Sequence, residues 1–385
     1  MLDLASVQNV FRSVYGTDPR LFSAPGRVNL IGEHTDYNDG FALPMAIDRR
    51  TVVAAAKRTD RKVRVTSNGI AKSEEFDLDR PGPKRRNSWL DYIEGTAQCL
   101  EMRNIKLVGA DLFIESDVPS GAGLSSSAAL EMSLALAMTS LASNEEFPRV
   151  ELALAGQAAE HAYVGTMCGI MDQFVAALGQ TDHALLIDCR TLETTPIPFA
   201  VPGAVILICD TGVKHELATS QYNRRRAECQ RGVELLRRVL PDVRALRDVS
   251  VAQFEQYGDT LADPVRKRCR HVVTENARTL DAVHALSEDD LSEFGRLMVL
   301  SHRSLQHDYE VTCPELDLCV EVATSQEGVY GARMTGGGFG GCTVNLVKRE
   351  AVGPVSDALR REFERRFGKR PEIFASRASQ GAIEH

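Results

Sequence analysis

The chain has 385 residues, 43% of them hydrophobic and 25% charged, which is enough for two or three globular domains. Its formal net charge is −8 with acids and bases interspersed, so it lacks the basic face that binds nucleic acid or an anionic membrane, and we expect small-molecule partners. The absence of a secretory signal, the shortness of the apolar runs and the nine singly placed cysteines indicate a cytoplasmic protein with reduced thiols, rather than a disulfide scaffold or a zinc protein.

Short β-branched runs alternate with polar turns in the first half of the chain. Four of these runs predict strands, at residues 50–59, 62–67, 110–119 and 183–190. A helix is expected at residues 125–142, where serines precede a series of good helix formers, and a second helix at residues 149–165.

The second half opens with a predicted strand at 204–210 and a long charged helix at 222–240, whose basic run we expect to be solvated. Residues 245–330 are mainly helical by pattern, including 291–310, and strands return at 332–347 and 370–376. The polar tail, 375–385, is expected to be ordered only in part. The Pro- and Gly-rich stretch 197–204 is the best candidate boundary, which divides the chain into residues 1–200 and 201–385. The pattern alone predicts an α+β or α/β protein of two domains.

The stretch GRVNLIGEHTDYNDG, residues 26–40, concentrates ionisable groups between two apolar runs. Arg27, Glu33, His34, Asp36 and Asp39 lie there among glycines. This loop is either an incidental polar connection or a binding surface whose polar groups are held in place by the runs on both sides.

A second loop, VPSGAGLSSSAALE at residues 118–131, leads from a predicted strand into a predicted helix. Gly121 and Gly123 allow a ligand to approach the backbone closely, and the helix start offers free N–H groups and a positive dipole end, as in a phosphate-binding loop. The loop lacks the lysine of a Walker A motif, and Ser126 stands where a Rossmann fingerprint has its third glycine. A plain helix cap is the alternative.

A third loop, MTGGGFGGC at residues 334–342, matches G-x-G-x-x-G, but a strand and not a helix follows it. A tight hairpin and a ligand contact are both compatible with these glycines.

Two acidic positions also have two interpretations each. Asp172 lies among apolar residues and is either a helix cap or ion-pair partner, or a group that accepts a hydroxyl proton. Glu160 and His161 form either a solvated helix face, or a place where Glu160 provides an oxygen ligand to Mg²⁺.

Together the three loops resemble the GHMP kinases, and residues 26–40 look like the galactokinase signature of that superfamily. The matches occur in the expected order and span residues 24–342. The resemblance implies an α+β fold of two domains, the first like ribosomal protein S5 domain 2 and the second ferredoxin-like, with the active site in the cleft between them. It also implies galactose metabolism: transfer of the γ-phosphoryl group of ATP to the C1 hydroxyl of α-D-galactose, with Mg²⁺ as cofactor and galactose and ATP as the partners of a monomer.

The resemblance also implies roles for individual residues. Asp172 matches the catalytic base, and Arg27 matches the cation beside it. The positions that match sugar ligands are Glu33, His34, Thr35, Asp36, Gly169 and Tyr222. The positions that match the nucleotide site are Gly121, Ala122, Gly123, Leu124, Ser125, Ser126 and Ser127 in the phosphate loop, with Ser67 and Trp89 at the adenosine pocket. Ser127 and Glu160 match the ligands of Mg²⁺.

A sugar ligand would explain the many polar groups of this loop, because each sugar hydroxyl needs a positioned hydrogen-bond donor or acceptor. Three alternatives stay open: a sister kinase of N-acetylgalactosamine, a galactose- and ATP-binding sensor without catalysis, and a structural or interaction protein. The unbroken GLSSSAALE run, together with Asp172 and Arg27, favours the enzyme over the sensor.

Overall fold

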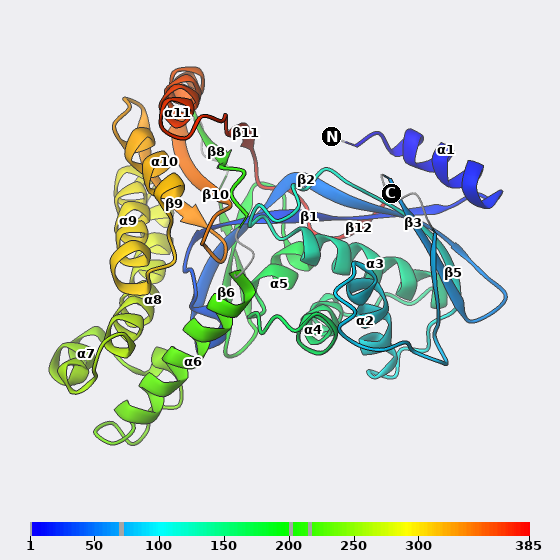
Figure 1. The fold of residues 1–385 in the computed structure, drawn as a ribbon, viewed down its shortest axis with the longest axis horizontal. Coiled ribbons are helices and arrows are strands. Elements are labelled where there is room, and N and C mark those ends of the chain that lie inside the picture. Colours follow the sequence, from blue (N-terminus) through cyan, green and yellow to red (C-terminus); the bar gives the residue numbers. More distant parts are fainter. Residues whose placement is uncertain (1, 69–72, 200–202, 215–217) are drawn as a thin grey trace.

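The structure is a computed structural model that describes residues 2–68, 73–199, 203–214 and 218–385. It has an N-terminal half, which ends with strand β7, and a C-terminal half, which begins with strand β8; the two lie side by side (Figure 1). The helices and strands of the N-terminal half are α1 (Leu4–Tyr15), β1 (Arg20–Ile31), β2 (Phe41–Lys57), β3 (Lys62–Ser67), β4 (Glu74–Asp77), α2 (Leu90–Glu101), β5 (Ala110–Ser116), α3 (Ser126–Ala142), α4 (Arg149–Ala159), α5 (Met171–Leu178), β6 (His183–Asp188) and β7 (Thr194–Pro198).

The N-terminal half is built on one twisted sheet. Its strand order is β12-β1-β2-β5-β3-β4. In addition, β6 pairs with the first residues of β2, and β7 pairs with β6. Helices α2 to α5 cover one face of the sheet, where their apolar side chains form the largest core cluster, and α1 packs on the other face (Figure 1).

The C-terminal half combines a second sheet with a helical layer. Its elements are β8 (Ala204–Asp210), α6 (Ala218–Leu236), α7 (Val251–Tyr257), α8 (Val265–Ser287), α9 (Leu291–Ser304), α10 (Pro314–Thr324), β9 (Val329–Thr335), β10 (Cys342–Lys348), α11 (Val352–Phe367), β11 (Glu372–Ser376) and β12 (Ile383–Glu384). The antiparallel order β11-β8-β10-β9, with helices between β8 and β9 and between β10 and β11, is that of a ferredoxin-like unit. The expected α+β fold is therefore confirmed.

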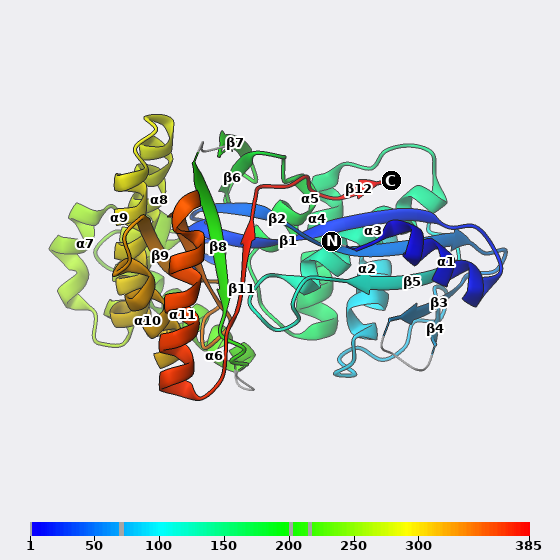
Figure 2. The ribbon, with the colours of Figure 1, turned by 90° about the horizontal axis from the view of Figure 1, so that it is seen from above.

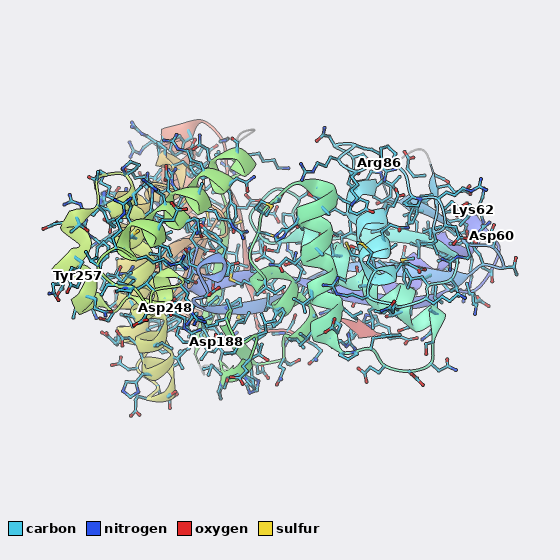
Figure 3. All side chains as sticks on the ribbon, turned by 90° about the horizontal axis from the view of Figure 1, so that it is seen from below. Asp60, Lys62, Arg86, Asp188, Asp248 and Tyr257 are labelled. Carbon is cyan, nitrogen blue, oxygen red and sulfur yellow. The ribbon has the colours of Figure 1, made fainter. Side chains whose placement is uncertain are left out.

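The two halves share strands and ion pairs. Strands β1 and β2 run from the N-terminal sheet toward helices α8 and α9 (Figure 2), and the chain returns after β11 to add β12 to the N-terminal sheet. Asp188 and Asp248 lie at this junction (Figure 3), where Arg247 Nη2 donates to Asp188 Oδ2 at 2.7 Å and Arg190 pairs with Asp248 at 2.7 Å. Burial raises the pKa of Asp188, but Arg247 and the backbone N–H groups of Thr191 and Arg190 together outweigh it and lower that pKa to about 2.

Most predicted elements are confirmed, with two corrections. The strands predicted within 332–347 are β9 and β10, which form a hairpin in which four of the linking glycines have positive φ. The helix predicted at 149–165 changes at Glu160 into one π-helical turn, Glu160–Val164. The tail is ordered rather than partly ordered, because Ser379 N donates to Ala46 O, Gly381 N donates to Gly179 O and β12 pairs with β1.

The basic run of α6 is only partly solvated. Arg224 is exposed, but Arg225 is buried and donates from Nε to Tyr309 O at 2.7 Å. The predicted division between residues 200 and 201 falls on residues 200–202, which lie outside the described residues, and it stays a prediction. Among the residues that the structure describes, no helix is long and apolar enough to cross a membrane.

Candidate active site

A cavity of about 210 Å³ lies where the two halves meet, and many of the predicted site residues line it. These are Arg27, Glu33, His34, Asp36, Ser127, Glu160, Gly169, Asp172 and Tyr222. They come from the end of β1, the starts of α3, α5 and α6, and the π-helical turn after α4. The fold thus brings together residues that are up to about half the chain apart in sequence.

Asp172 and Arg27 form the ion pair at the centre of this cavity. Nε and Nη2 of Arg27 donate to the two carboxylate oxygens of Asp172, each at 2.8 Å, and Ser125 Oγ donates to Asp172 Oδ2 at 2.5 Å. The Arg27 side chain is 5% exposed and that of Asp172 is 27% exposed, so the carboxylate is the member of the pair that a ligand can reach. The interpretation of Asp172 as an ion-pair partner is confirmed, and its place in the cavity lining leaves its role as a proton acceptor a prediction.

The loop that resembles a phosphate site leads into α3 and is held by Arg27. Arg27 Nη1 donates to Gly123 O at 2.6 Å, and its backbone N–H donates to Leu124 O at 3.0 Å. Ser125 stands at the N-cap in the left-handed region, with φ 58°, and its hydroxyl bonds Asp172 rather than the helix end. The first N–H groups of α3 therefore lack a side-chain cap and stay available to an anion.

The glycine hairpin between β9 and β10 packs behind this loop. A Cβ atom on Gly336 would lie 2.7 Å from Gly123 O, and one on Gly341 would lie 2.7 Å from Ala122 O. The hairpin interpretation of MTGGGFGGC is therefore correct for the backbone, while Gly337 lines the cavity. These glycines let two backbones touch, which explains their density without a nucleotide-binding helix.

The polar loop after β1 places a neutral histidine in the cavity. Burial and nearby cations lower the pKa of His34 well below its usual value. Its Nδ1 bonds the Tyr37 hydroxyl at 2.9 Å, its ring lies 5.5 Å from the Tyr222 ring, and its Nε2 has no partner among the described residues. A buried polar atom of this kind needs a partner, and a ligand hydroxyl in the cavity would supply one.

Glu33 is held by an arginine from the C-terminal half. Arg333, which has no exposed surface, donates from Nη2 to Glu33 Oε2 at 3.0 Å and from Nη1 to Asn29 O at 2.8 Å. Burial raises the pKa of Glu33, and the charges of Arg333 and Arg27 oppose that rise. Gly336 N also donates to Glu33 Oε2, so the hairpin, the polar loop and Arg333 form one connected network.

The negative charge of Asp36 is disfavoured by its surroundings. Burial, followed by the charges of Asp172 and Glu33, raises its pKa to about 7. Its carboxylate lies against the Cα atom of Gly169, so closely that a methyl group on Gly169 would overlap it. Asp36 is thus fixed in place by contact while its charge is disfavoured.

We expect an Asp36→Asn variant to be more stable than the wild type at pH 8, by an amount that shrinks toward pH 5. The pKa of Asp36 is about 7 in the folded chain, against 3.8 for an ordinary aspartate, so stability present below about pH 4 is lost as the pH rises toward 7. The loss amounts to about 1.4 kcal/mol for each pH unit in that window. Asparagine does not titrate and avoids it. Urea unfolding of both proteins at pH 5, 6, 7 and 8 measures the difference, with Asp357→Asn, at a side chain that is 78% exposed, as the control. A difference that is independent of pH would contradict the assignment.

Ser127 and Glu160 lie together at the edge of the cavity. Glu160 is 5% exposed, and burial raises its pKa to about 7, with a hydrogen bond to Ser127 acting in the opposite direction. The interpretation of Glu160 as part of a solvated helix face is therefore wrong. One carboxylate and one hydroxyl beside a phosphate loop fit Mg²⁺, which keeps several waters and takes its other ligands from substrate phosphates. Among the described residues, no group of three His, Cys, Asp or Glu side chains could hold a metal without such help.

Nine predicted site residues do not line this cavity: Thr35, Ser67, Trp89 and the six residues from Gly121 to Ser126. Thr35 is buried, and its hydroxyl bonds Gly32 O at 2.8 Å and Phe41 O at 2.7 Å, which shapes the loop from within. Ser67 ends β3, and Trp89 precedes α2 and packs against the core of the N-terminal half. Gly121 to Ser126 adjoin the cavity as the phosphate loop without lining it.

Several residues near the site were not predicted from the sequence. Tyr92, Thr166, Cys168 and Met171 line the cavity, and the stem of Lys214 lies 3.2 Å from the position that a Cβ atom on Gly121 would take. Lys214 places an ammonium group next to the phosphate loop, although the loop itself contains no lysine. Thr166, Cys168 and Met171 lie in the chain between Glu160 and Asp172, and Lys214 lies eight positions before Tyr222, but no motif marks any of them or Tyr92.

A second, larger cavity of about 500 Å³ is lined by residues of β2, β8, β10 and β11, and by neighbouring loops. It contains none of the predicted site residues. The candidate active site is therefore the smaller cavity, where acids, a buried arginine and the phosphate loop meet.

Comparison with known families gives three matches in the order of the three loops. The galactokinase galactose-binding signature matches residues 9–57, the GHMP kinases N terminal domain matches residues 91–180, and the GHMP kinases C terminal domain matches residues 282–365. The chain is 48% identical to the galactokinase of Chloroflexus aggregans over 99% of this chain and 97% of that protein. It is 47% identical, with the same coverage, to the galactokinase of Roseiflexus sp..

Solved structures agree with these matches. The galactokinase of Lactococcus lactis, solved in complex with galactose, superposes with a TM-score of 0.95 at 36% identity and covers 99% of both chains. The mevalonate kinase of Methanococcus jannaschii, at 20% identity and a TM-score of 0.63 over 95% of this chain and all of that one, shares the fold. The site and the comparisons lead to one conclusion: this chain belongs to the galactokinase family of the GHMP kinases.

Proposed function

We propose that this chain transfers the γ-phosphoryl group of ATP to the C1 hydroxyl of α-D-galactose, giving galactose 1-phosphate and ADP. The observation that carries the proposal is the Arg27–Asp172 pair. It lies between the polar loop of residues 26–40, which we assign to galactose and call the sugar loop, and the phosphate loop. An acceptor hydroxyl beside Asp172 would then lie between its base and its phosphoryl donor.

The sugar loop supplies the recognition. Glu33, Asp36 and His34 offer carboxylate oxygens and a ring nitrogen on one wall of the cavity, and Gly169 and Tyr222 line the wall with them. Galactose pairs its hydroxyls with these groups, whereas its epimer glucose would leave one of them unpaired and buried. Such an unpaired group is the usual basis of strong discrimination between sugars.

The chemistry rests on positioning and on charge. Asp172 orients the C1 hydroxyl and accepts its proton, and the Arg27 guanidinium holds the carboxylate in place and balances negative charge that develops during transfer. Phosphoryl transfer has a loose transition state, so in-line geometry and neutralised oxygens contribute most of the rate. Backbone N–H groups at the start of α3 and the Lys214 ammonium would supply part of that neutralisation.

We also infer that Ser127 and Glu160 hold Mg²⁺ together with the phosphates of ATP, which would neutralise phosphate charge. The adenosine part of ATP is assigned to the side of the phosphate loop that carries Ser67 and Trp89, on the strength of the resemblance alone. A place in the cytoplasm agrees with the nine cysteines, all of them free thiols in the structure. That the protein acts as a monomer rests on the resemblance alone.

The test is release of ADP from ATP and Mg²⁺ with four candidate acceptors: galactose, N-acetylgalactosamine, glucose and mevalonate. We expect turnover with galactose and a product phosphorylated at C1. Galactose binding without ADP release would instead support the sensor, and turnover with N-acetylgalactosamine alone would support the sister kinase.

A further inference from the structure

The backbone of the sugar loop is held by a helix of the C-terminal half. Gly32 N and Glu33 N both donate to Glu275 Oε1 of α8, at 3.0 and 3.3 Å. One turn earlier on the same helix, His271 Nε2 bonds Glu33 O at 3.0 Å. Since a carbonyl oxygen only accepts, His271 is the donor in that bond. Two side chains of α8 thus form hydrogen bonds with three backbone groups at the start of the loop.

Glu275 is completely buried and its remaining bonds come from the same helical layer. Ser301 Oγ of α9 donates to Oε1 at 2.6 Å, and Arg278 Nε donates to Oε2 at 2.8 Å. His271 is completely buried as well, and its Nδ1 bonds Ser304 Oγ at 3.0 Å. Glu275 and His271 are therefore held in position, because each also bonds a side chain of α8 or α9.

Neither Glu275 nor His271 lines the cavity, so neither touches a ligand there. Glu33 and His34 do line it: the backbone of Glu33 makes two of these contacts, and His34 is the next residue. Their direction into the cavity follows from the path of the backbone at Gly32 and Glu33. A carboxylate that accepts two successive N–H groups fixes that path more tightly than either bond alone.

We propose that Glu275 and His271 are positioning residues for galactose, which hold the sugar loop in its binding conformation from the opposite half of the molecule. The inference rests on the proposed function, because it assigns the loop to galactose. Without these hydrogen bonds, the loop has to be ordered when galactose binds, which weakens galactose affinity. The phosphate loop depends on Arg27 and the glycine hairpin, so ATP binding stays unchanged.

Two matched pairs of variants test the inference. Glu275→Met removes the acceptor at nearly constant volume, and Glu275→Gln restores an acceptor oxygen. His271→Leu removes the donor, and His271→Gln restores one near the position of Nε2. Calorimetry measures the Kd of galactose and of a non-hydrolysable ATP analogue for each protein, after thermal unfolding has identified the variants that fold.

We expect Glu275→Met and His271→Leu to raise the Kd of galactose by about tenfold to a hundredfold, with partial recovery in the two glutamine variants. The Kd of the ATP analogue should stay within about twofold of the wild type. A folded methionine or leucine variant with wild-type galactose affinity would overturn the inference, as would equal weakening of both ligands. If Glu275→Met does not fold, the histidine pair decides alone. A wild-type protein that binds no galactose would overturn the proposed function itself, and the inference with it.

Discussion

An Asp172→Asn variant is expected to lose about 10²- to 10⁴-fold in turnover, the range that a positioned general base contributes. Asparagine has nearly the same shape, so its amide oxygen still accepts from Arg27 or from Ser125, and the fold and ATP affinity should persist. What disappears is the oxygen that takes the proton of the acceptor hydroxyl. ADP release at saturating galactose and ATP measures the loss, and calorimetry with an ATP analogue confirms binding.

A second variant separates proton acceptance from orientation by Asp172. Ser125→Ala removes the hydroxyl that donates to Asp172 Oδ2 and leaves both bonds from Arg27 intact. It should lower turnover far less than Asp172→Asn does. If Asp172→Asn retained turnover within about tenfold of the wild type, Asp172 would not be the base, and the Arg27–Asp172 pair would have to be regarded as structural.

A Gly169→Ala variant is expected to raise the KM of galactose by about a hundredfold or more, because displacing a positioned group by about 1 Å has effects of that size. The added methyl group would overlap the Asp36 carboxylate, which has to move. Gly169 is absent from the glycines with positive φ, so alanine adds no backbone strain and the effect is steric. The KM of ATP should stay within about threefold.

Steady-state kinetics with each substrate varied in turn measures this separation. Gly353→Ala is the matched control, because a Cβ atom there meets nothing within 4 Å and the residue lies in helix α11. An unchanged KM of galactose in Gly169→Ala would show that Asp36 does not contribute to sugar binding. Equal increases for both substrates would indicate general damage to the site.

The part of the site that could be predicted lies in local loops. Two short segments, Gly121 to Ser127 and Glu33 to Asp36, contain both the residues that form a turn and the polar groups on it. Their motifs can therefore be recognised without a structure. Asp172 and Arg27 required the resemblance, since nothing in either segment shows that they pair across 145 positions.

The part that could not be predicted depends on packing between distant segments. Glu275 reaches Gly32 across 243 positions, and Arg333 reaches Glu33 across 300. Each of these side chains looks like an ordinary helix or strand residue in the sequence. Only the arrangement of the two halves shows that they support the sugar loop.

Helix α1 was missed for another reason. Asp3 caps its start by accepting from Ala5 N, and Gly16 ends it with φ 72°, which are two ordinary signals of helix boundaries. These signals were present in the sequence, and the helix could have been predicted from them. The glycine hairpin is a different case, because the strand expected after the G-x-G-x-x-G match indicates that no Rossmann helix follows, and β10 is that strand.

The pairing of β12 with β1 has a consequence for synthesis of the protein. Ser23 bonds His385 at 2.7 Å across 362 positions, so β1 leaves the ribosome long before its edge partner is made. At the usual rate of translation that delay is roughly 20 to 70 seconds. Throughout that time the backbone groups of β1 that bond the tail, at Leu21 to Ser23, lack these partners, and an open strand edge attracts other strands. The nascent chain should therefore depend on protection of β1, and loss of a few C-terminal residues should make a transient exposure permanent.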